Sequence, residues 1–152
     1  MVEVEDGNVY EYEGAHGEEA LRKVIFFDPD DGKVVINFAG EKDNEHFYRK
    51  EYEDGLVMTY EGAKDNEALR KMTTDAVTIF YGGPKNHEYK IRKEFKSGTI
   101  ETYDGAKDEE ALREVSIVTR FGRRSTFYGG PKDQEYPIRM PYSADRNAPR
   151  PF

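Results

Sequence analysis

The sequence predicts an all-β protein built from six tandem β-hairpin repeats of about 22 residues, arranged in an elongated, twisted, single antiparallel sheet. The first observation is a Tyr-x-Gly or related string that returns six times, at intervals of 21 to 26 residues. The second is a turn dipeptide and a stretch rich in β-branched and aromatic residues ahead of most copies. The third is composition, because a chain of 152 residues that is 36% apolar, with 11 Tyr and 9 Phe, suits a thin sheet better than a thick core.

Five positions recur and define the repeat unit. Counted from the glycine, an aromatic lies two positions before it, a Lys (His16 in the first unit) two after it, a Glu five after it, and an Arg eight or nine after it. The Arg is at the eighth position in units one, three and five (type A) and at the ninth in units two, four and six (type B), so two unit types alternate. The repeat positions are Tyr12, Phe38, Tyr60, Tyr81, Tyr103 and Tyr128; Gly14, Gly40, Gly62, Gly83, Gly105 and Gly130; Glu19, Glu45, Glu67, Glu88, Glu110 and Glu135; and Arg22, Arg49, Arg70, Arg92, Arg113 and Arg139.

From the N-terminus, the expected elements follow one another in a fixed order. Residues 1–6 (MVEVED) alternate apolar and acidic side chains, which is typical of an edge strand. Each unit then gives a strand, a tight loop at the glycine, a partner strand and a turn, and dipeptides such as Asp6-Gly7 and Asp54-Gly55 are typical hairpin turns. Six hairpins predict about twelve antiparallel strands, with the register and the buried face left open.

The segment EALR in the type A units contains good helix formers, yet only about two helical turns fit before the next strand. Type B units carry segments such as EYKIRKEF in the same place, whose alternation favours strand. We therefore expect short helical turns at most in the EALR loops. The extra residue of type B is interpreted as a bulge or a wider loop.

The repeats predict one domain over residues 1–142. Residues 143–152 (SADRNAPRPF) have no periodicity and contain Pro, so they predict an extended C-terminal tail. The expected units are about 6–30, 31–53, 54–74, 75–96, 97–120 and 121–142.

The Tyr-x-Gly strings, with a period near 22 residues, resemble the MORN (membrane occupation and recognition nexus) class of β-hairpin repeat. The likeness spans residues 7–142, and its best points are the strings at 12–14, 60–62 and 103–105. The resemblance is to a divergent form of that repeat, since the chain lacks the aromatic soon after the glycine and the second Gly-x-Gly that are usual in that family. The resemblance implies an extended, twisted antiparallel sheet. Similar Tyr-x-Gly repeats in uncharacterised proteins of large DNA viruses and algae imply no activity.

Charge and composition exclude several classes of function. A net charge of −8 argues against a general nucleic-acid binder or a polybasic membrane adhesive. No window is apolar enough to predict a membrane span. Without Cys there is neither a disulfide framework nor a thiolate site. We expect an intracellular protein, with a virus-encoded one in the host cytoplasm or the virion as an alternative.

The sequence predicts no catalytic residue, no metal site and no cofactor, and hence no enzyme. His16, His46 and His87 occupy unrelated positions of their units, so a shared metal site is not expected. The segment DPDDGK at 28–33 resembles part of a calcium loop, but the twelfth position is Ala39 instead of Glu, which favours a turn. Nucleophile and phosphate-loop motifs are absent from the sequence.

The repeated Glu and Arg are open to two interpretations. They could form a ligand-binding ladder, or each Arg could stack on the recurring aromatic and pair with the Glu of its loop. We favour the second, in which the pairs chiefly set the register.

Partner contacts are expected where the repeat symmetry breaks. Arg120, Arg123 and Arg124 cluster in an otherwise acidic chain, and Phe152 is an aromatic residue after Pro. The sequence thus predicts a non-catalytic structural or protein-interaction scaffold that binds a protein partner, or itself, through sheet edges and the C-terminal tail. The alternative is a module that binds a carbohydrate or a phospholipid headgroup on an aromatic and Arg face.

Overall fold

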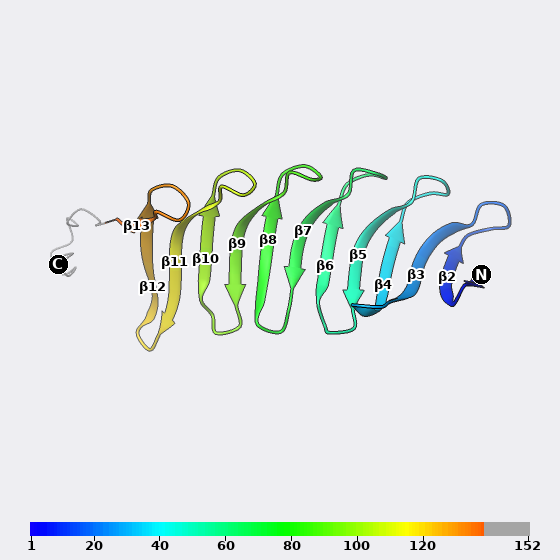
Figure 1. Cartoon of the computed structure of the whole chain (residues 1–152), viewed down its shortest axis with the longest axis horizontal. Helices are drawn as coiled ribbons and strands as arrows, with labels where there is room; N and C mark the ends of the chain where they lie inside the picture. The colour runs from blue at the N-terminus through cyan, green and yellow to red at the C-terminus, as the bar shows by residue number, and fades with distance from the viewer. Residues whose placement is uncertain (139–152) are drawn as a thin grey trace.

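A computed structural model of the chain describes residues 1–138. Thirteen strands form one open sheet in which each strand pairs antiparallel with its neighbours in the sequence (Figure 1). This confirms the predicted all-β fold of tandem hairpins in a single antiparallel sheet. The strands are β1 (Val2–Glu5), β2 (Asn8–Glu13), β3 (Ala20–Asp28), β4 (Gly32–Ala39), β5 (His46–Tyr52), β6 (Val57–Glu61), β7 (Ala68–Thr73), β8 (Val77–Gly82), β9 (Tyr89–Phe95), β10 (Ile100–Asp104), β11 (Ala111–Thr119), β12 (Gly122–Gly129) and β13 (Tyr136–Pro137).

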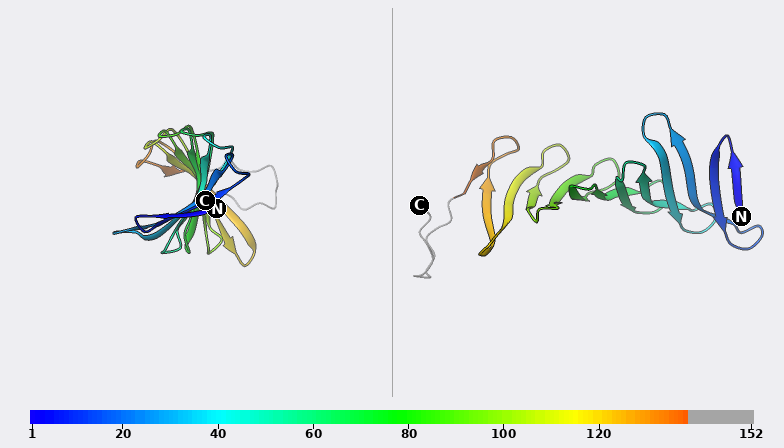
Figure 2. Two further views of the ribbon diagram at one scale, coloured as in Figure 1. Left: turned by 90° about the vertical axis from the view of Figure 1, so that its right-hand side faces the viewer. Right: turned by 90° about the horizontal axis from the view of Figure 1, so that it is seen from below.

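The sheet is long, twisted and only one layer thick. Figure 1 shows the repeat loops along one long edge, which we call the loop edge, and the short hairpin turns along the other, the turn edge. Figure 2 shows the strands rotating steadily about the long axis, as expected from the intrinsic twist of β-strands. Equivalent points of successive units therefore lie in a row along the loop edge.

No helical turn interrupts the EALR segments. In the third unit, strand β7 begins at Ala68, directly after Glu67, and the preceding loop residues form a tight turn closed by Asn66 N donating to Ala63 O at 2.9 Å. The short helical turns that the sequence allowed at most do not form in these loops, and a strand follows each loop as expected. The physical reason is that a loop this short cannot complete a helical turn without losing the pairing of β6 with β7.

A β-bulge follows each of the first five loops, in both unit types. The pairing shifts, for example, between Thr59 opposite Lys71 and Tyr60 opposite Leu69, which leaves Arg70 as the extra residue. The bulge is always the eighth residue after the glycine, and the types differ in which residue occupies it. The bulged residues are Arg22, Tyr48, Arg70, Ile91 and Arg113.

The recurring aromatic residues share one side of the sheet, which we call the ring face. Successive strand pairs place Tyr10, Ile36, Met58 and Ile79 on this face. The recurring aromatics lie two residues further along the same strands, and side chains two residues apart on a strand point to the same side. Val9, Val35, Val57 and Ile100 stand at odd spacing from the rings and lie on the opposite side, the back face.

The core is thin. Among the described residues, the buried apolar side chains are Val34 and three alanines, Ala20, Ala68 and Ala111, and no large side chain is fully buried. The best-packed rings are Phe38, Phe47 and Tyr60, whose edge-to-face pairs have centroid distances of 6.4 and 4.8 Å. Such pairs add about 0.5–1.5 kcal/mol each beyond the area they bury. Contacts between units must therefore supply much of the stability.

Candidate functional site

The loop edge is held together by a ladder of lysines. In units two to six, the Lys two positions after the glycine donates to the main-chain carbonyl of the preceding loop, as Lys64 Nζ does to Asp43 O at 2.8 Å. The accepting residue is always the third after its glycine and has a positive φ, for example 70° at Asp43 and 67° at Asp65. Only Gly, Asp or Asn occupies this position in the six units, which are the residues that tolerate a left-handed backbone. The other rungs are Lys42 to Gly17, Lys85 to Asp65, Lys107 to Asn86 and Lys132 to Asp108.

A second ladder uses the loop glutamates. Glu88 Oε2 accepts the main-chain N–H of Leu69, in the preceding unit, at 3.0 Å. A hydrogen bond to a charged acceptor is stronger than one between neutral groups, so this ladder helps to hold successive units together. The equivalent bonds are Leu21 to Glu45, Phe47 to Glu67, Lys90 to Glu110 and Leu112 to Glu135.

This ladder corrects the expected pairing of loop Glu with Arg. The sequence shows that Glu and Arg recur together, but charge pairing is only one way to use a carboxylate. Across an open loop, the main-chain N–H of the neighbouring unit has no strand partner and needs an acceptor. The glutamate therefore accepts a main-chain N–H of the preceding unit, and the arginine has other partners.

Backbone hydrogen bonds lower the pKa of these glutamates. The bond from Leu21 holds the pKa of Glu45 below its ordinary value, and the bond from Leu112 does the same for Glu135. Burial acts to raise the pKa of Glu88 and Glu110, but backbone hydrogen bonds from Leu69 and Lys90 and nearby lysines outweigh it and lower the pKa of both.

The free energy of unfolding should therefore fall in acid. A carboxyl whose pKa is lower in the folded state stabilises the fold above its unfolded value of about 4.3, and this stabilisation is lost as pH falls through the folded pKa. Urea titrations from pH 7 down to about pH 3 should show the loss. Glu88→Gln keeps an acceptor but cannot ionise, so its pH dependence should be shallower than that of the native chain. Equal pH dependence of the two chains would contradict the assignment.

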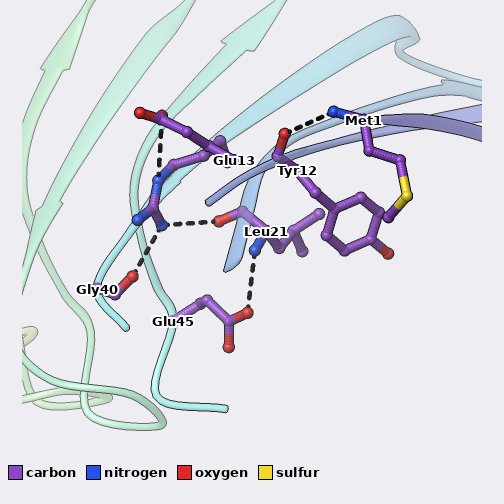
Figure 3. Close-up of polar contacts among 7 residues, drawn as sticks. Met1, Tyr12, Glu13, Leu21, Gly40 and Glu45 are labelled. Carbon is purple, nitrogen blue, oxygen red and sulfur yellow. Dashed lines mark hydrogen bonds and ion pairs between the residues drawn. The ribbon is translucent and has the colours of Figure 1, made fainter. Parts of the chain in front are cut away.

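In type A units the bulged arginine ties one unit to the next. Arg22 Nη1 donates to the carbonyls of Leu21 and Gly40, the latter at 2.8 Å, and Arg22 Nε lies 3.7 Å from Glu13 Oε2 (Figure 3). A bulge re-aims its side chain, which allows this reach across the loop edge. Arg70 bonds Gly83 and lies near Glu61, and Arg113 bonds Gly130 and lies near Asp104, in the same way.

In type B units the arginine does something different. Arg49 and Arg92 directly follow the bulge and form ion pairs with Glu51 and Glu94 of their own strands, at 2.6 and 3.0 Å. The strand pairs through Thr59, Lys71 and Phe80 place both arginines on the back face. They lie on the face opposite to the recurring rings. The expected stacking of Arg on the repeat aromatic is therefore not what these units use. Arg139, the closing Arg of the sixth unit, lies outside the described residues.

The two unit types also differ in the residue that pairs across the loop. In type A, Glu61 faces Ala68, which is 2% exposed. In the type B units four and six a glycine faces a tyrosine, and the nearest Tyr89 ring atom lies 3.1 Å from where a Cβ on Gly82 would stand; in unit two Ala39 faces His46. The double glycine of FYGGPK therefore also makes room for the tyrosine ring, in addition to its place in the turn.

The small alanine leaves an open hollow at each type A loop. The three hollows have volumes of about 450, 270 and 420 Å³. Each has the same main features: a carboxylate that is about four-fifths exposed, the guanidinium of the bulged Arg, and the Lys of the next loop. A site with both charges within reach suits polar peptide groups or charged side chains of a partner.

The ring face carries cations as well as aromatics. Lys50 Nζ lies 4.5 Å from the Phe47 ring centroid and 5.1 Å from that of Tyr60, and Lys90 and Lys93 lie over Tyr103. Burial lowers the pKa of Lys50, while Glu67 acts in the opposite direction. Burial raises the pKa of Tyr60 to about 12, so its hydroxyl stays protonated.

The remaining candidate residues are scattered. Arg123 donates to Ser116 Oγ and Gly98 O, and Arg120 lies over the Phe121 ring at the turn edge. Phe152 falls outside the described residues. In DPDDGK the Asp28 side chain accepts the N–H groups of Asp30 and Asp31, which closes a turn and lowers its pKa. Within residues 1–138, no group of three His, Cys, Asp or Glu is placed to hold a metal ion.

Comparison of the chain with protein-family models, with curated proteins and with solved structures found no match in any of the three. Residues 1–138 contain no helix that could cross a membrane.

Proposed function

We propose that the protein is a non-catalytic scaffold whose repeat sheet binds a protein partner along its loop edge and associates with itself through its strand edges. The observation that carries the proposal is the hollow that occurs three times with the same chemistry, at Arg22, Arg70 and Arg113. A reaction centre is a single place with its own residues, whereas three equivalent sites suit repeated contact with one extended partner.

The spacing of the hollows defines the partner further. The three arginines lie on β3, β7 and β11, so each interval spans four strands, or about 19 Å at 4.8 Å per strand. An extended chain advances about 3.3 Å per residue, so it would meet the same hollow about every six residues. We expect a partner segment with charged or polar side chains at that interval. Three weak sites of this kind would together bind more tightly than one, because the first contact holds the partner at a high effective concentration near the other two.

The resemblance to MORN repeats supports the same proposal, because such sheets are extended and thin. An intracellular setting, with a virus-encoded origin as an alternative, remains part of the proposal because the chain has no Cys.

A module for a carbohydrate or a phospholipid headgroup is the second candidate. The observation in its favour is that Lys50, Lys90 and Lys93 lie over rings on one face. Rings stack on sugars, and ammonium groups attract phosphate. Arg49 and Arg92 lie on the other face, which weakens an aromatic and Arg site.

Site-specific photo-crosslinking tests the scaffold against this alternative. A photoreactive residue at Glu13, Glu61 or Asp104, in extracts of cells that express the protein, should capture the same partner from all three positions. The matched control is Asp54, an exposed acidic residue at the turn edge, which should capture none of it. A thermal shift with soluble saccharides or with vesicles of anionic phospholipid, together with loss of the loop-edge crosslinks, would contradict the scaffold.

A further inference from the structure

Within residues 1–138, each end of the sheet presents a strand edge with unpaired main-chain groups. At one end β1 pairs with β2 alone. At the other end β13 pairs only with Tyr128 and Gly129 of β12, and Ile138 N donates to Phe127 O at 2.7 Å. In the part of the chain that the structure describes, no strand covers the outer edge of residues 122–126. Such edges are templates for a further strand.

The outward-facing main-chain groups at the two edges can be identified from the pairing. Met1 and Tyr12 exchange hydrogen bonds, and bonded pairs alternate in an antiparallel ladder, so Glu3 and Glu5 bond to β2 while Val2 and Val4 point outward. At the other end Phe127 O points outward, and the same alternation gives outward N–H and C=O groups at Arg123 and Ser125.

The two edges are also compatible in face and direction. The paired rows run unbroken from Val4 to Ser125, so these residues lie on the same face, the back face, and Glu3 and Arg124 lie on the ring face. Strands alternate in direction through the sheet, so β1 runs opposite to β12 (Figure 1). A second copy placed end to end would therefore offer an antiparallel strand with matching faces.

Charge favours this union over other pairings of the same edges. Residues 1–15 carry five acidic side chains and no basic one, while residues 119–127 carry three arginines and no acidic residue. Two copies of β1 would bring Glu3 and Glu5 against each other, and two copies of β12 would bring Arg123 and Arg124 together. Like charges directly opposite destabilise a strand pair, whereas opposite charges stabilise it.

We propose that the protein assembles head to tail, with β1 of one copy adding antiparallel to the open edge of β12 in another, so that Glu3 lies opposite Arg124. Val4 then pairs with Arg123 and Val2 with Ser125, which uses both outward-facing residues of each strand and leaves β13 in place. A shift by two residues would set Val2 against Phe127, whose carbonyl already accepts Ile138 N. The interface is heterologous, so it generates a filament or a ring.

The loop ladders do not continue across such a junction. In the sixth unit the position that donates to the next loop Glu is Pro137, which has no N–H. In the first unit the lysine of the ladder is His16, and Glu19 accepts its own loop's Gly17 N. The added contacts are thus confined to β1 and the arginine-rich half of β12. We expect reversible association that rises with protein concentration and weakens with salt.

The chain's own C-terminal segment is the less suitable occupant. Residues 139–152 contain three Arg, one Asp and three Pro. Its basic side chains outnumber the acidic one, so its charge has the same sign as that of Arg123 and Arg124 at the edge.

Cysteine crosslinking tests the pairing, because the native chain has no Cys. Glu3 and Arg124 would form a non-hydrogen-bonded pair with Cα atoms about 4.5 Å apart, within disulfide range. Glu3→Cys and Arg124→Cys chains, mixed at low salt and oxidised, should give a mixed disulfide on a non-reducing gel. Glu18→Cys, an exposed loop position, mixed with Arg124→Cys measures random collision. A yield no higher than that control overturns the pairing, and a higher yield from Glu5→Cys overturns the register.

Charge reversal provides a second test in the full chain. Glu3→Arg or Arg124→Glu alone should weaken association about tenfold or more by sedimentation, and the double variant should recover it. Both residues are exposed, so the fold should persist, which circular dichroism checks. Failure of the double variant to recover association would contradict the pairing. The inference rests on the proposed self-association through strand edges, and the loop-edge crosslinks are read independently of it.

Discussion

Gly105→Ala is expected to reduce the free energy of unfolding by about 3–5 kcal/mol, a large loss for a domain of this size. Gly105 has a φ of 123°, in a region where side chains are strained by about 1–3 kcal/mol. An added Cβ would also stand 2.6 Å from the main-chain oxygen of Glu109 across the same loop. Backbone cannot move aside as a flexible side chain can. The loop must open, and Glu110 would be displaced from Lys90 N, which it accepts at 3.0 Å.

Gly122→Ala is the matched control. Gly122 has a similar φ of 111°, but nothing lies within 4 Å of an added Cβ. It should therefore lose only the strain, about 1–2 kcal/mol. Urea denaturation followed by circular dichroism gives both values, and the difference between the variants measures the close contact inside the repeat loop. Equal losses would show that the loop yields without cost.

The sequence was sufficient to predict the hairpins because their signals are local. Alternation in segments such as 1–6, and turn dipeptides such as Asp54-Gly55, act within a few residues, and most of the six units carry such a dipeptide. The stacking order follows, since consecutive hairpins pair with their neighbours unless a long connection intervenes. In the EALR segments propensity allows a helical turn, but pairing with the preceding strand decides for β.

The candidate site was harder to predict from the sequence, since it depends on contacts between units. That Glu88 serves Leu69 N, and not an Arg, follows only once the register brings the two units together. The bulge likewise depends on pairing over the loop. The sequence suggested a bulge or a wider loop in type B units only, whereas the bulge at Arg70 lies in a type A unit. One overlooked signal was present. The restriction of the third position after the glycine to Gly, Asp or Asn indicates a left-handed residue, whose carbonyl the next lysine binds.

Ala68→Tyr should reduce the free energy of unfolding by about 2–3 kcal/mol, because it puts a large side chain at a buried position of a hollow. Ala68 is 2% exposed and pairs across the loop with Glu61, while Arg70 bonds Gly83 O at 2.8 Å beside it. A tyrosine ring there would enter the hollow and displace the Glu61 and Arg70 side chains that line it, which would break the bond to Gly83. Units four and six accept a tyrosine in this position because a glycine faces it, Gly82 opposite Tyr89 and Gly129 opposite Tyr136.

Glu61→Gly should therefore rescue Ala68→Tyr, since the double variant recreates the type B pair. A double-mutant cycle from urea denaturation should give a favourable coupling of about 1–2 kcal/mol between the two changes. Asp104→Gly makes an equivalent change two units away, so its effect should simply add to that of Ala68→Tyr. Zero coupling at Glu61, or equal coupling at Asp104, would mean that the two unit types are not defined by the fit between these side chains. A positive result would also fill one hollow, which allows its share of partner capture to be measured against the other two.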